Sequence, residues 1–286
     1  MRIPSGPSPR TWFITGAGRG LGRAYAVAAL ERGDQVVAVA RSVARSDFDD
    51  AHGDRVLALA VDVTDRAAVF AAMSTAVERF GRLDIVVNNA GTMSSGMVEE
   101  FTEAEARAQL EVNFFGALWV SQAALGRMRE QGSGHIVQIS SIGGLGGFPS
   151  TGLYSASKFA LEGMSEALAL EAAAFGVKVS IVQPGGYWTD LYTSMATTTP
   201  AEPYGPLREE LARQWAEGSI DSDPRLAAEA MLKLVDSPEP PLRLLLGSMV
   251  YDLAFDISRR RMAVWAGWEE VSRAAEHAVP APGGAG

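Results

Sequence analysis

The stretch TGAGRGLG, residues 15–22, decides the fold class of this 286-residue chain because of what stands on either side of it. An apolar run from Trp12 to Thr15 precedes it, and a helical pattern from Gly22 to Arg32 follows it. A strand, a glycine-rich turn and a helix in this order bring the unpaired N–H groups of a helix N-terminus to the turn, where they can bind a phosphate. The stretch therefore predicts a dinucleotide-binding turn.

Three glycines of this stretch suit such a turn. Gly16 permits a tight reversal, Gly20 lets the backbone approach a pyrophosphate, and Gly22 allows the helix to pack closely. Their spacing is GxxxGxG and differs from the commoner GxGxxG. A glycine-rich turn that only reverses the chain is the structural alternative, but the flanking strand and helix favour a binding turn.

The rest of the chain repeats this alternation of strand and helix. Short apolar runs that suit strands buried on both faces stand at residues 12–15, 36–40, 56–61, 85–88, 136–140, 179–182 and 242–246. Alanine-rich helical patterns between them include residues 22–32, 66–80, 102–129 and 155–175. Seven strands alternating with helices predict a single doubly wound α/β domain, with a parallel Rossmann-like sheet and a ligand site beyond the carboxyl ends of its strands.

The limits of this domain follow from proline, glycine and periodicity. Residues 1–10 and 279–286 have no periodic apolar pattern, so we interpret them as flexible tails around a domain that spans residues 11–278. Residues from about 187 to 220 interrupt the alternation with aromatic residues and three prolines. This interruption indicates a small helical substrate-loop insertion.

The composition excludes several classes of protein. With 34 acidic and 25 basic residues the net charge is −9, which disfavours nucleic acid as a partner. The chain has no cysteine, and its three histidines lie far apart in the sequence, so we expect neither a disulfide nor a metal site. Because no apolar stretch is long enough to span a bilayer or to serve as a signal peptide, we expect a cytoplasmic protein without a membrane partner.

Two arginines bear on which dinucleotide is bound. Sites specific for NAD place an acidic residue at the end of the second strand, whereas this strand ends with Ala40, Arg41 and Ser42. Arginine matches a ribose 2′-phosphate in charge and geometry, and Arg19 in the glycine-rich turn is placed to assist Arg41. The alternative is that both are solvated surface charges. We expect NADP(H) to be preferred, with NAD(H) possible.

A serine, a tyrosine and a lysine form the second candidate site. In YSASK, Tyr154 and Lys158 are four residues apart at the start of a helical pattern, so they share one helix face. A nearby ammonium favours the phenolate of a tyrosine, whose pKa is otherwise near 10. Ser141, at the end of the strand GHIVQISS, can hydrogen-bond a substrate carbonyl. Ser140 competes with it, but side-chain alternation along the strand and the spacing to the tyrosine favour Ser141.

Taken in order, these motifs resemble those of the short-chain dehydrogenase/reductase family, in its compact single-domain branch. The resemblance covers about residues 11–250, and several independent motifs in the expected order make chance agreement improbable. The motifs are TGAGRGLG, DVTD with Asp62, NNAG at Asn88 to Gly91, Asn113, Ser141, YSASK, and PGGYWT from Pro184 to Thr189.

The resemblance implies a role for each matching residue. Tyr154 is the expected general acid/base, Ser141 polarises the substrate carbonyl, and Lys158 binds the cofactor ribose and lowers the pKa of the tyrosine. Asn113 is the expected fourth catalytic residue, which bends its helix and holds a water that connects the lysine to solvent. The residues expected at the cofactor are Gly16, Arg19, Gly20, Leu21, Arg41, Asp62, Val63, Asn88, Asn89, Ala90, Gly91, Tyr154, Lys158, Pro184, Gly185 and Thr189.

Structural alternatives stand beside some of these roles. Asp62 could cap the helix that follows it, and Thr189 could cap the first helix of the insertion. Asn113 could be a buried helix amide without a part in proton transfer. Asp34, which precedes the second strand, is interpreted as a turn residue.

The activity that the resemblance implies is reversible hydride transfer between a nicotinamide and a carbonyl or secondary alcohol carbon. Residues 93–96, 142–148 and 187–195 are mostly apolar or aromatic, so we expect a medium to large hydrophobic ketone or alcohol as substrate. One alternative is a non-redox enzyme of the same fold, an epimerase or dehydratase. The other is a dinucleotide-sensing regulatory protein without turnover.

Alanine and leucine stripes on the helices around Asn113 and Tyr154 extend beyond what one sheet face can cover. In the family such helices pair across a two-fold axis, so we expect a homodimer or homotetramer with isologous contacts. Trp265 and Trp268 either join that contact or pack within their own subunit.

Overall fold

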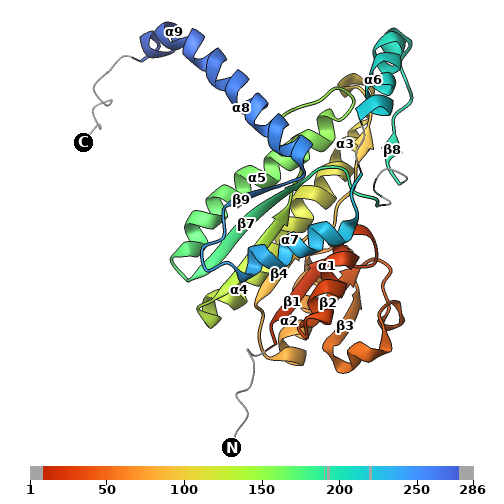
Figure 1. The fold of residues 1–286 in the computed structure, drawn as a ribbon, viewed down its shortest axis with the longest axis vertical. Helices are drawn as coiled ribbons and strands as arrows, with labels where there is room; N and C mark the ends of the chain where they lie inside the picture. The colour runs from red at the N-terminus through yellow and green to blue at the C-terminus, as the bar shows by residue number, and fades with distance from the viewer. Residues whose placement is uncertain (1–8, 190, 192–193, 219–220, 277–286) are drawn as a thin grey trace, which may run out of the picture.

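The centre of the fold is a sheet of seven strands that all run parallel (Figure 1). The structure is a computed structural model and describes residues 9–189, 191, 194–218 and 221–276. The strand order β3-β2-β1-β4-β6-β7-β9 confirms the predicted doubly wound, Rossmann-like sheet. The strands are β1 (Thr11–Thr15), β2 (Gln35–Ala40), β3 (Val56–Ala60), β4 (Ile85–Asn88), β6 (Gly134–Ile139), β7 (Val177–Pro184) and β9 (Arg243–Leu246).

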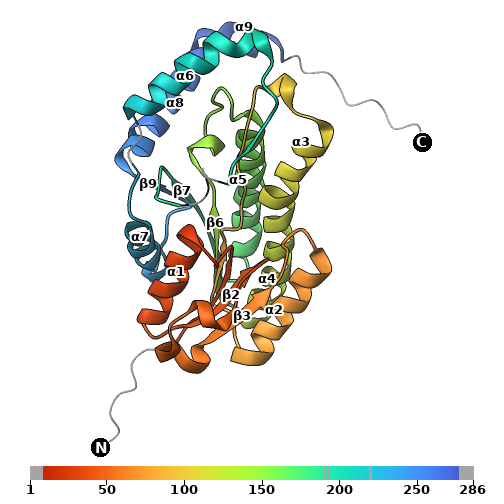
Figure 2. The same cartoon turned by 90° about the vertical axis from the view of Figure 1, so that its right-hand side faces the viewer.

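Helices cover both faces of this sheet, with α1 and α7 on one side and α2, α4 and α5 on the other (Figure 2). The helices are α1 (Gly20–Glu31), α2 (Arg66–Phe80), α3 (Glu103–Leu110), α4 (Ala117–Gln131), α5 (Gly152–Ala173), α6 (Gly205–Gly218), α7 (Pro224–Asp236), α8 (Ser248–Gly267) and α9 (Glu269–Ala274). Short 3₁₀ helices span Arg45–Asp47, Asp50–Arg55, Val98–Glu100, Ile142–Gly144 and Glu202–Tyr204.

The core explains why the strands are apolar without interruption. Alternate residues of β1 enter two separate clusters: Trp12 and Ile14 pack on the side of α1 and α7, and Phe13 packs on the side of α2 and α4. Each of these three side chains is at most 1% exposed. A parallel sheet covered on both faces buries both sets of side chains, so its strands cannot alternate apolar with polar residues.

The helix predicted over residues 102–129 is not a single α-helix. Thr102 caps α3, with its Oγ1 accepting from the backbone N–H of Glu105. After α3 the chain forms a π-helical segment, Glu111–Gly116, before α4 begins. Hydrophobic periodicity does not distinguish a π turn inside a helix, so it did not indicate this segment, whereas the family resemblance implied a bend at Asn113. The π segment contains Asn113, which is 1% exposed.

Two parts of the chain stand beyond the carboxyl ends of the strands. In the insertion, β8 (Ala196–Thr197) pairs with β5 (Ser94–Ser95), and α6 follows, so only its second half has the expected helical character. Helices α8 and α9 project away from the sheet (Figure 1). Trp265 and Trp268 on this projection are 64% and 62% exposed, and thus do not pack within their own subunit.

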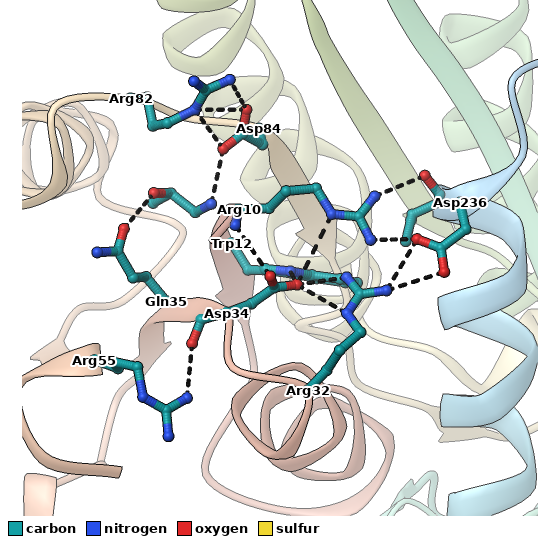
Figure 3. A network of polar contacts seen from close by, with 11 residues as sticks. Arg10, Trp12, Arg32, Asp34, Gln35, Arg55, Arg82, Asp84 and Asp236 are labelled. Atoms are coloured by element: carbon teal, nitrogen blue, oxygen red, sulfur yellow. Dashed lines mark hydrogen bonds and ion pairs between the residues drawn. The ribbon is translucent and has the colours of Figure 1, made fainter. Parts of the chain in front are cut away.

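The amino ends of the strands are joined by a network of ion pairs and hydrogen bonds (Figure 3). Asp34 is only 6% exposed and accepts from the backbone N–H of Arg10 at 3.0 Å, from Nε1 of Trp12 at 2.8 Å and from Nε of Arg32 at 3.1 Å. It is therefore the buried centre of this network, a role that its interpretation as a turn residue before the second strand did not include.

Arg10 also departs from its expected place in the N-terminal tail. Its guanidinium donates to the carbonyl oxygen of Val235 at 2.9 Å and pairs with Asp236 at the end of α7. These contacts tie Arg10 to the domain. The predicted boundary excluded it because an apolar pattern carries no information about ion pairs. The other residues of the two expected tails, apart from Pro9, lie outside the described residues. No helix among the described residues is long and apolar enough to cross a membrane.

Candidate active site

A cavity of about 840 Å³ lies beyond the carboxyl ends of the strands, where an open parallel sheet binds its ligands. Three of the four expected catalytic residues, Ser141, Tyr154 and Lys158, line it. The cavity is also lined by these expected cofactor residues: Gly16, Arg19, Gly20, Leu21, Arg41, Asp62, Val63, Asn89, Ala90, Gly91, Pro184, Gly185 and Thr189. Asn88 and Asn113 are not part of the lining.

The glycine-rich turn is packed as a close cradle. Gly16 has a φ of 67°, a left-handed conformation that favours glycine. A Cβ on Gly22 would lie 2.3 Å from the carbonyl oxygen of Gly16 and 2.4 Å from Nδ2 of Asn89. Asn89 donates from Nδ2 to the carbonyl oxygen of Thr15 at 3.0 Å, which joins the turn to the end of β4. The N-terminus of α1 therefore opens onto a surface of backbone atoms, which fits a pyrophosphate.

Arg19, Arg41 and Asp62 all line the cavity, and Nη2 of Arg19 donates to Oγ of Ser194 at 3.3 Å. Asp62 Oδ1 accepts from the backbone N–H of Thr64 at 2.9 Å and from its hydroxyl at 2.8 Å. These bonds lower the pKa of Asp62, and the charge of Arg41 adds to the effect. The cap of α2 is Asp65, not Asp62, so the helix-cap alternative for Asp62 was wrong.

Lys158 is buried beside the ring of Tyr154. It is 6% exposed, its Nζ donates to the carbonyl oxygen of Ile139 at 2.8 Å, and the same atom lies 5.6 Å from the centroid of the tyrosine ring. Burial lowers the pKa of Lys158 to about 8, while Glu162 opposes the shift. When charged, this ammonium favours the phenolate form of Tyr154.

The two adjacent serines differ in what their hydroxyls contact. Ser140 is 2% exposed, and its hydroxyl donates to Oε1 of Glu162 at 2.6 Å. Ser141 is half-buried at the end of β6, and its Oγ accepts from the backbone N–H of Gly143 at 3.2 Å. The Ser140 hydroxyl is thus committed to the interior, while Ser141 retains its hydroxyl proton for a ligand in the cavity.

Asn113 lies behind the cavity wall. Its Oδ1 accepts from the backbone N–H of Thr92 at 2.8 Å, and its Nδ2 donates to the carbonyl oxygen of Thr92 at 2.9 Å and to Oγ of Ser157 at 3.0 Å. The side chain therefore joins the loop after β4 to α5. Its position is that of a buried amide in a distorted helix, and its expected part in proton transfer stays a prediction.

Asn88 is also structural in its contacts. It is 3% exposed, and its Nδ2 donates to Oγ of Ser121 at 3.0 Å and to Oε1 of Gln138 at 2.9 Å. The expectation that Asn88 lies at the cofactor was wrong, because this side chain points between β4, β6 and α4. Its neighbour Asn89 faces the cavity instead.

Glu162 was missed by the sequence analysis. It is 3% exposed, and besides Ser140 it accepts from Nε2 of Gln183 at 2.7 Å and from Nε of Arg243 at 3.1 Å. One carboxylate thus joins α5 to β6, β7 and β9 behind the catalytic residues. The available signal was its position four residues after Lys158, which places both on one helix face.

Besides the expected cofactor and catalytic residues, the cavity has a mostly apolar lining from the expected substrate segments, α6 and α8, which we call its far half. Met93, Ile142, Phe148, Tyr187 and Leu191 come from the segments expected to line the substrate pocket. Of the same segments, residues 94–96, 144–147, 188, 194 and 195 do not line it, and Asp190, Tyr192 and Thr193 lie outside the described residues. Lining residues that were not expected include Leu211 and Gln214 from α6 and Met249 and Leu253 from α8.

The chain matches a family model described as short chain dehydrogenase over residues 10–200. Oxidoreductase BOA17 of Botryotinia fuckeliana is 41% identical over 272 residues, which cover 93% of this chain and 98% of the relative. A 3-ketodihydrosphingosine reductase of Bacteroides thetaiotaomicron is 37% identical over 246 residues, which cover 85% of this chain and 89% of the relative.

Solved structures of similar fold include complexes with nicotinamide dinucleotides. A short-chain dehydrogenase from Streptomyces avermitilis has a TM-score of 0.86 and 39% identity, covering 95% of this chain and all of that one. An alcohol dehydrogenase from Thermococcus sibiricus, complexed with 5-hydroxy-NADP, has a TM-score of 0.70 and 26% identity over 84% of this chain and 96% of its own. A 3-ketoacyl-(acyl-carrier-protein) reductase from Brucella melitensis, complexed with NADH, has a TM-score of 0.69 and 27% identity over 82% of this chain and 96% of its own.

Proposed function

Since this chain belongs to the short-chain dehydrogenase/reductase family and is an oxidoreductase of that family, we propose that it reduces the carbonyl group of a neutral hydrophobic ketone with NADPH. The observation that carries the proposal is the meeting of Ser141, Tyr154 and Lys158 with the glycine-rich turn at one cavity. A hydride donor site and a proton donor site on opposite sides of one carbonyl are what this reaction needs.

The close cradle of the glycine-rich turn supports binding of the cofactor, which supplies the hydride when bound. In the proposed arrangement, Asp62 holds the adenine, Lys158 the ribose, and Thr189 the nicotinamide. Arg41, exposed at the end of β2, would pair with the 2′-phosphate that distinguishes NADP from NAD. Neighbouring structures hold either dinucleotide, so the proposed preference for NADP(H) rests on this arginine and on the lack of an acidic residue at the end of β2.

The chain's own residues would handle the proton. The hydroxyls of Ser141 and Tyr154 bind the substrate oxygen, and Tyr154 gives its proton to that oxygen as negative charge develops there. The ammonium of Lys158 stabilises the resulting phenolate, because the two groups lie on one face of α5. In the reverse direction the same phenolate takes the proton of a secondary alcohol.

The proposal of a neutral hydrophobic substrate rests on the far half of the cavity. None of its described lining residues, namely Met93, Ile142, Phe148, Tyr187, Leu191, Leu211, Gln214, Met249 and Leu253, has a charged side chain. A charged substrate group would lose its hydration there without a partner. The name of one relative, a 3-ketodihydrosphingosine reductase, supports a ketone as the reacting group and does not bear on the charge of the substrate.

A homodimer or homotetramer is part of the proposal, and a cytoplasmic location stays a prediction. Leu170 on α5 is 82% exposed and Phe159 is 41% exposed, which supports contact between copies through this helix. The exposed Trp265 and Trp268 support a further contact through the α8–α9 projection. Light scattering at micromolar concentration should report two or four times 30.3 kDa, and a species of 30.3 kDa alone would contradict this part of the proposal.

The test of function is loss of the reduced-nicotinamide absorbance with a panel of hydrophobic ketones, with the products identified. We expect NADPH consumption matched by formation of the secondary alcohol. Conversion of a substrate without net NADPH consumption would instead indicate an epimerase or dehydratase. Tight NADPH binding without turnover of any ketone would favour a dinucleotide-sensing protein.

A further inference from the structure

Helix α6 forms part of the cavity wall although it has little core of its own. Leu211 and Gln214 line the cavity from this helix, which stands beyond the carboxyl ends of the strands (Figure 1). None of its residues from Gly205 to Gln214 is buried. Because most helices in proteins are held by packing of an apolar face, other contacts must set the position of α6.

Glu100 supplies such contacts from outside the insertion. It ends the 3₁₀ helix after β5, and its side chain is 1% exposed. Its Oε2 accepts from Oγ1 of Thr198 at 2.8 Å, and its Oε1 accepts from the backbone N–H of Ala201 at 2.8 Å. It also forms an ion pair with Arg208 on α6. A single carboxylate therefore holds three points of the chain between residues 198 and 208.

These contacts continue an attachment through backbone pairing earlier in the insertion. Strand β8 pairs with β5, and the backbone N–H of Thr198 donates to the carbonyl oxygen of Ser95 at 3.1 Å. After Thr198 the backbone pairing ends. Among the ion pairs of the described residues, the one between Arg208 and Glu100 joins α6 to the body, whereas that of Arg213 with Glu210 lies within the helix.

The spacing along α6 connects this attachment to the cavity. Arg208 and Leu211 are three residues apart and thus neighbours on one face of the helix. When Glu100 holds the guanidinium of Arg208, the same helical turn is oriented with Leu211 at the cavity. Loss of the carboxylate would leave the helix free to turn or to lift.

We propose that Glu100 is a positioning residue for the substrate half of the site, which holds α6 in place through Thr198, Ala201 and Arg208 and so shapes the wall that a bulky substrate contacts. It touches neither the cofactor site nor the catalytic residues. The consequence for turnover rests on the proposed function, whereas the attachment itself does not. The position of α6 should matter for a bulky apolar substrate, since a small ketone at Tyr154 need not reach Leu211.

Hydrogen exchange of the full-length chain tests the attachment without any substrate. In Glu100→Gln the amide nitrogen would face the donors of Thr198, Ala201 and Arg208, so amides of residues 200–214 should exchange at least fivefold faster than in the wild type. The exchange rates of amides around Tyr154 should not change. Arg213→Met is the matched control, because it removes an arginine of the same helix whose partner lies within α6, and it should leave the exchange of α6 within twofold.

Two further variants keep the test decisive if Glu100→Gln folds poorly. Arg208→Met should reproduce the faster exchange of α6, and Arg208→Lys should restore most of the protection because it keeps the charge. Unchanged exchange of α6 in Arg208→Met would overturn the proposal. An equal rise over the whole chain would also overturn it, because it would show a general loss of stability instead of a local attachment.

Kinetics then test the consequence for the substrate. With 2-decanone as the bulky probe, Arg208→Met should raise KM about tenfold with kcat within twofold, while KM for 2-butanone and the Kd of NADPH stay within twofold. Equal rises in KM for both ketones would overturn the assignment of Glu100 to the substrate half. If neither ketone is reduced by the wild type, the proposed function fails, and hydrogen exchange still decides the attachment.

Discussion

At the amino ends of the strands a buried carboxylate is surrounded by donors, whereas at the carboxyl ends a buried ammonium borders an open cavity. Asp34 accepts from Arg10, Trp12 and Arg32, and these contacts leave it 6% exposed (Figure 3). Lys158 is equally buried, but the ring of Tyr154 and a cavity of about 840 Å³ lie beside it. At the amino ends the buried charge of Asp34 thus contributes to stability, whereas at the carboxyl ends the charge of Lys158 stays available for chemistry.

The buried polar groups at the two ends also join different segments of the chain. The network around Asp34 ties the first strand to the end of α7 through Arg10 and Asp236. At the opposite end, Glu162 fixes the strands that lie behind the catalytic residues. The comparison teaches that changes in the network at the amino ends should alter stability and leave activity intact, while changes in the residues that line the cavity at the carboxyl ends should do the reverse.

The largest effect is expected from Tyr154→Phe, which keeps the ring but removes the proton donor. Turnover should fall by about 100- to 10,000-fold, the range that proton transfer by a positioned group contributes. The Kd of NADPH and the free energy of unfolding should stay close to those of the wild type. Fluorescence titration of NADPH and steady-state kinetics measure the two quantities, and near wild-type turnover would eliminate the proposed role of Tyr154.

Asp34→Ala should have the largest effect at the amino ends. It leaves the guanidinium of Arg32 and the indole N–H of Trp12 without this acceptor, so the free energy of unfolding should fall by about 3 kcal/mol. The kcat of the folded fraction should not change. Urea unfolding and kinetics at one temperature check both values, and a lowered kcat in the fully folded variant would break the comparison between the two ends.

The pKa of Asp34 sets how the stability difference between the wild type and Asp34→Ala depends on pH. Burial raises the pKa of Asp34, but its bonds from Arg32, Arg10 and Trp12 outweigh burial and hold the pKa below its ordinary value. A carboxyl with a lowered folded pKa contributes stability above its unfolded pKa of about 3.9 and loses it as the pH falls through the folded value. The difference in the free energy of unfolding between the wild type and Asp34→Ala should therefore be largest above about pH 4 and should shrink as the pH falls from there toward the lower folded pKa.

A smaller effect is expected for cofactor choice. Arg41→Asp removes the proposed partner of the 2′-phosphate and introduces repulsion, so the ratio of kcat/KM with NADPH to that with NADH should fall at least about tenfold. Both variants must be measured at one salt concentration because the side chain is exposed. A wild-type preference for NADH, or an unchanged ratio in the variant, would show that Arg41 is only a surface charge.

The smallest effect should come from Arg82→Ala, also at the amino ends. Arg82 is 49% exposed and pairs with Asp84, so its loss should lower the free energy of unfolding by less than about 1 kcal/mol. Comparison with Asp34→Ala separates burial from mere membership of the network. A loss as large as that of Asp34→Ala would mean that the network acts as one unit.

The alternation of strands and helices, the glycine-rich turn and the catalytic spacing could be predicted from the sequence because they depend on local patterns. Residues 15–22 between a strand and a helix, and Tyr154 four residues before Lys158, have few folded arrangements open to them. The choice of Ser141 over Ser140 followed from strand alternation, which also underlies the observed burial of Ser140.

Only the tertiary structure decided which distant residues meet. From the sequence, Asp34 was interpreted as a turn residue and Arg10 as part of the tail. No local pattern predicts that Arg10 forms an ion pair with Asp236 at the end of α7. Glu100 and Arg208 are 108 residues apart, and no local pattern could connect them. The lining of the cavity by α6 and α8 and the interior position of Asn88 were likewise decided by how distant elements pack. Hydrophobic periodicity reports which face of an element is buried, whereas partners across the fold depend on how the elements pack.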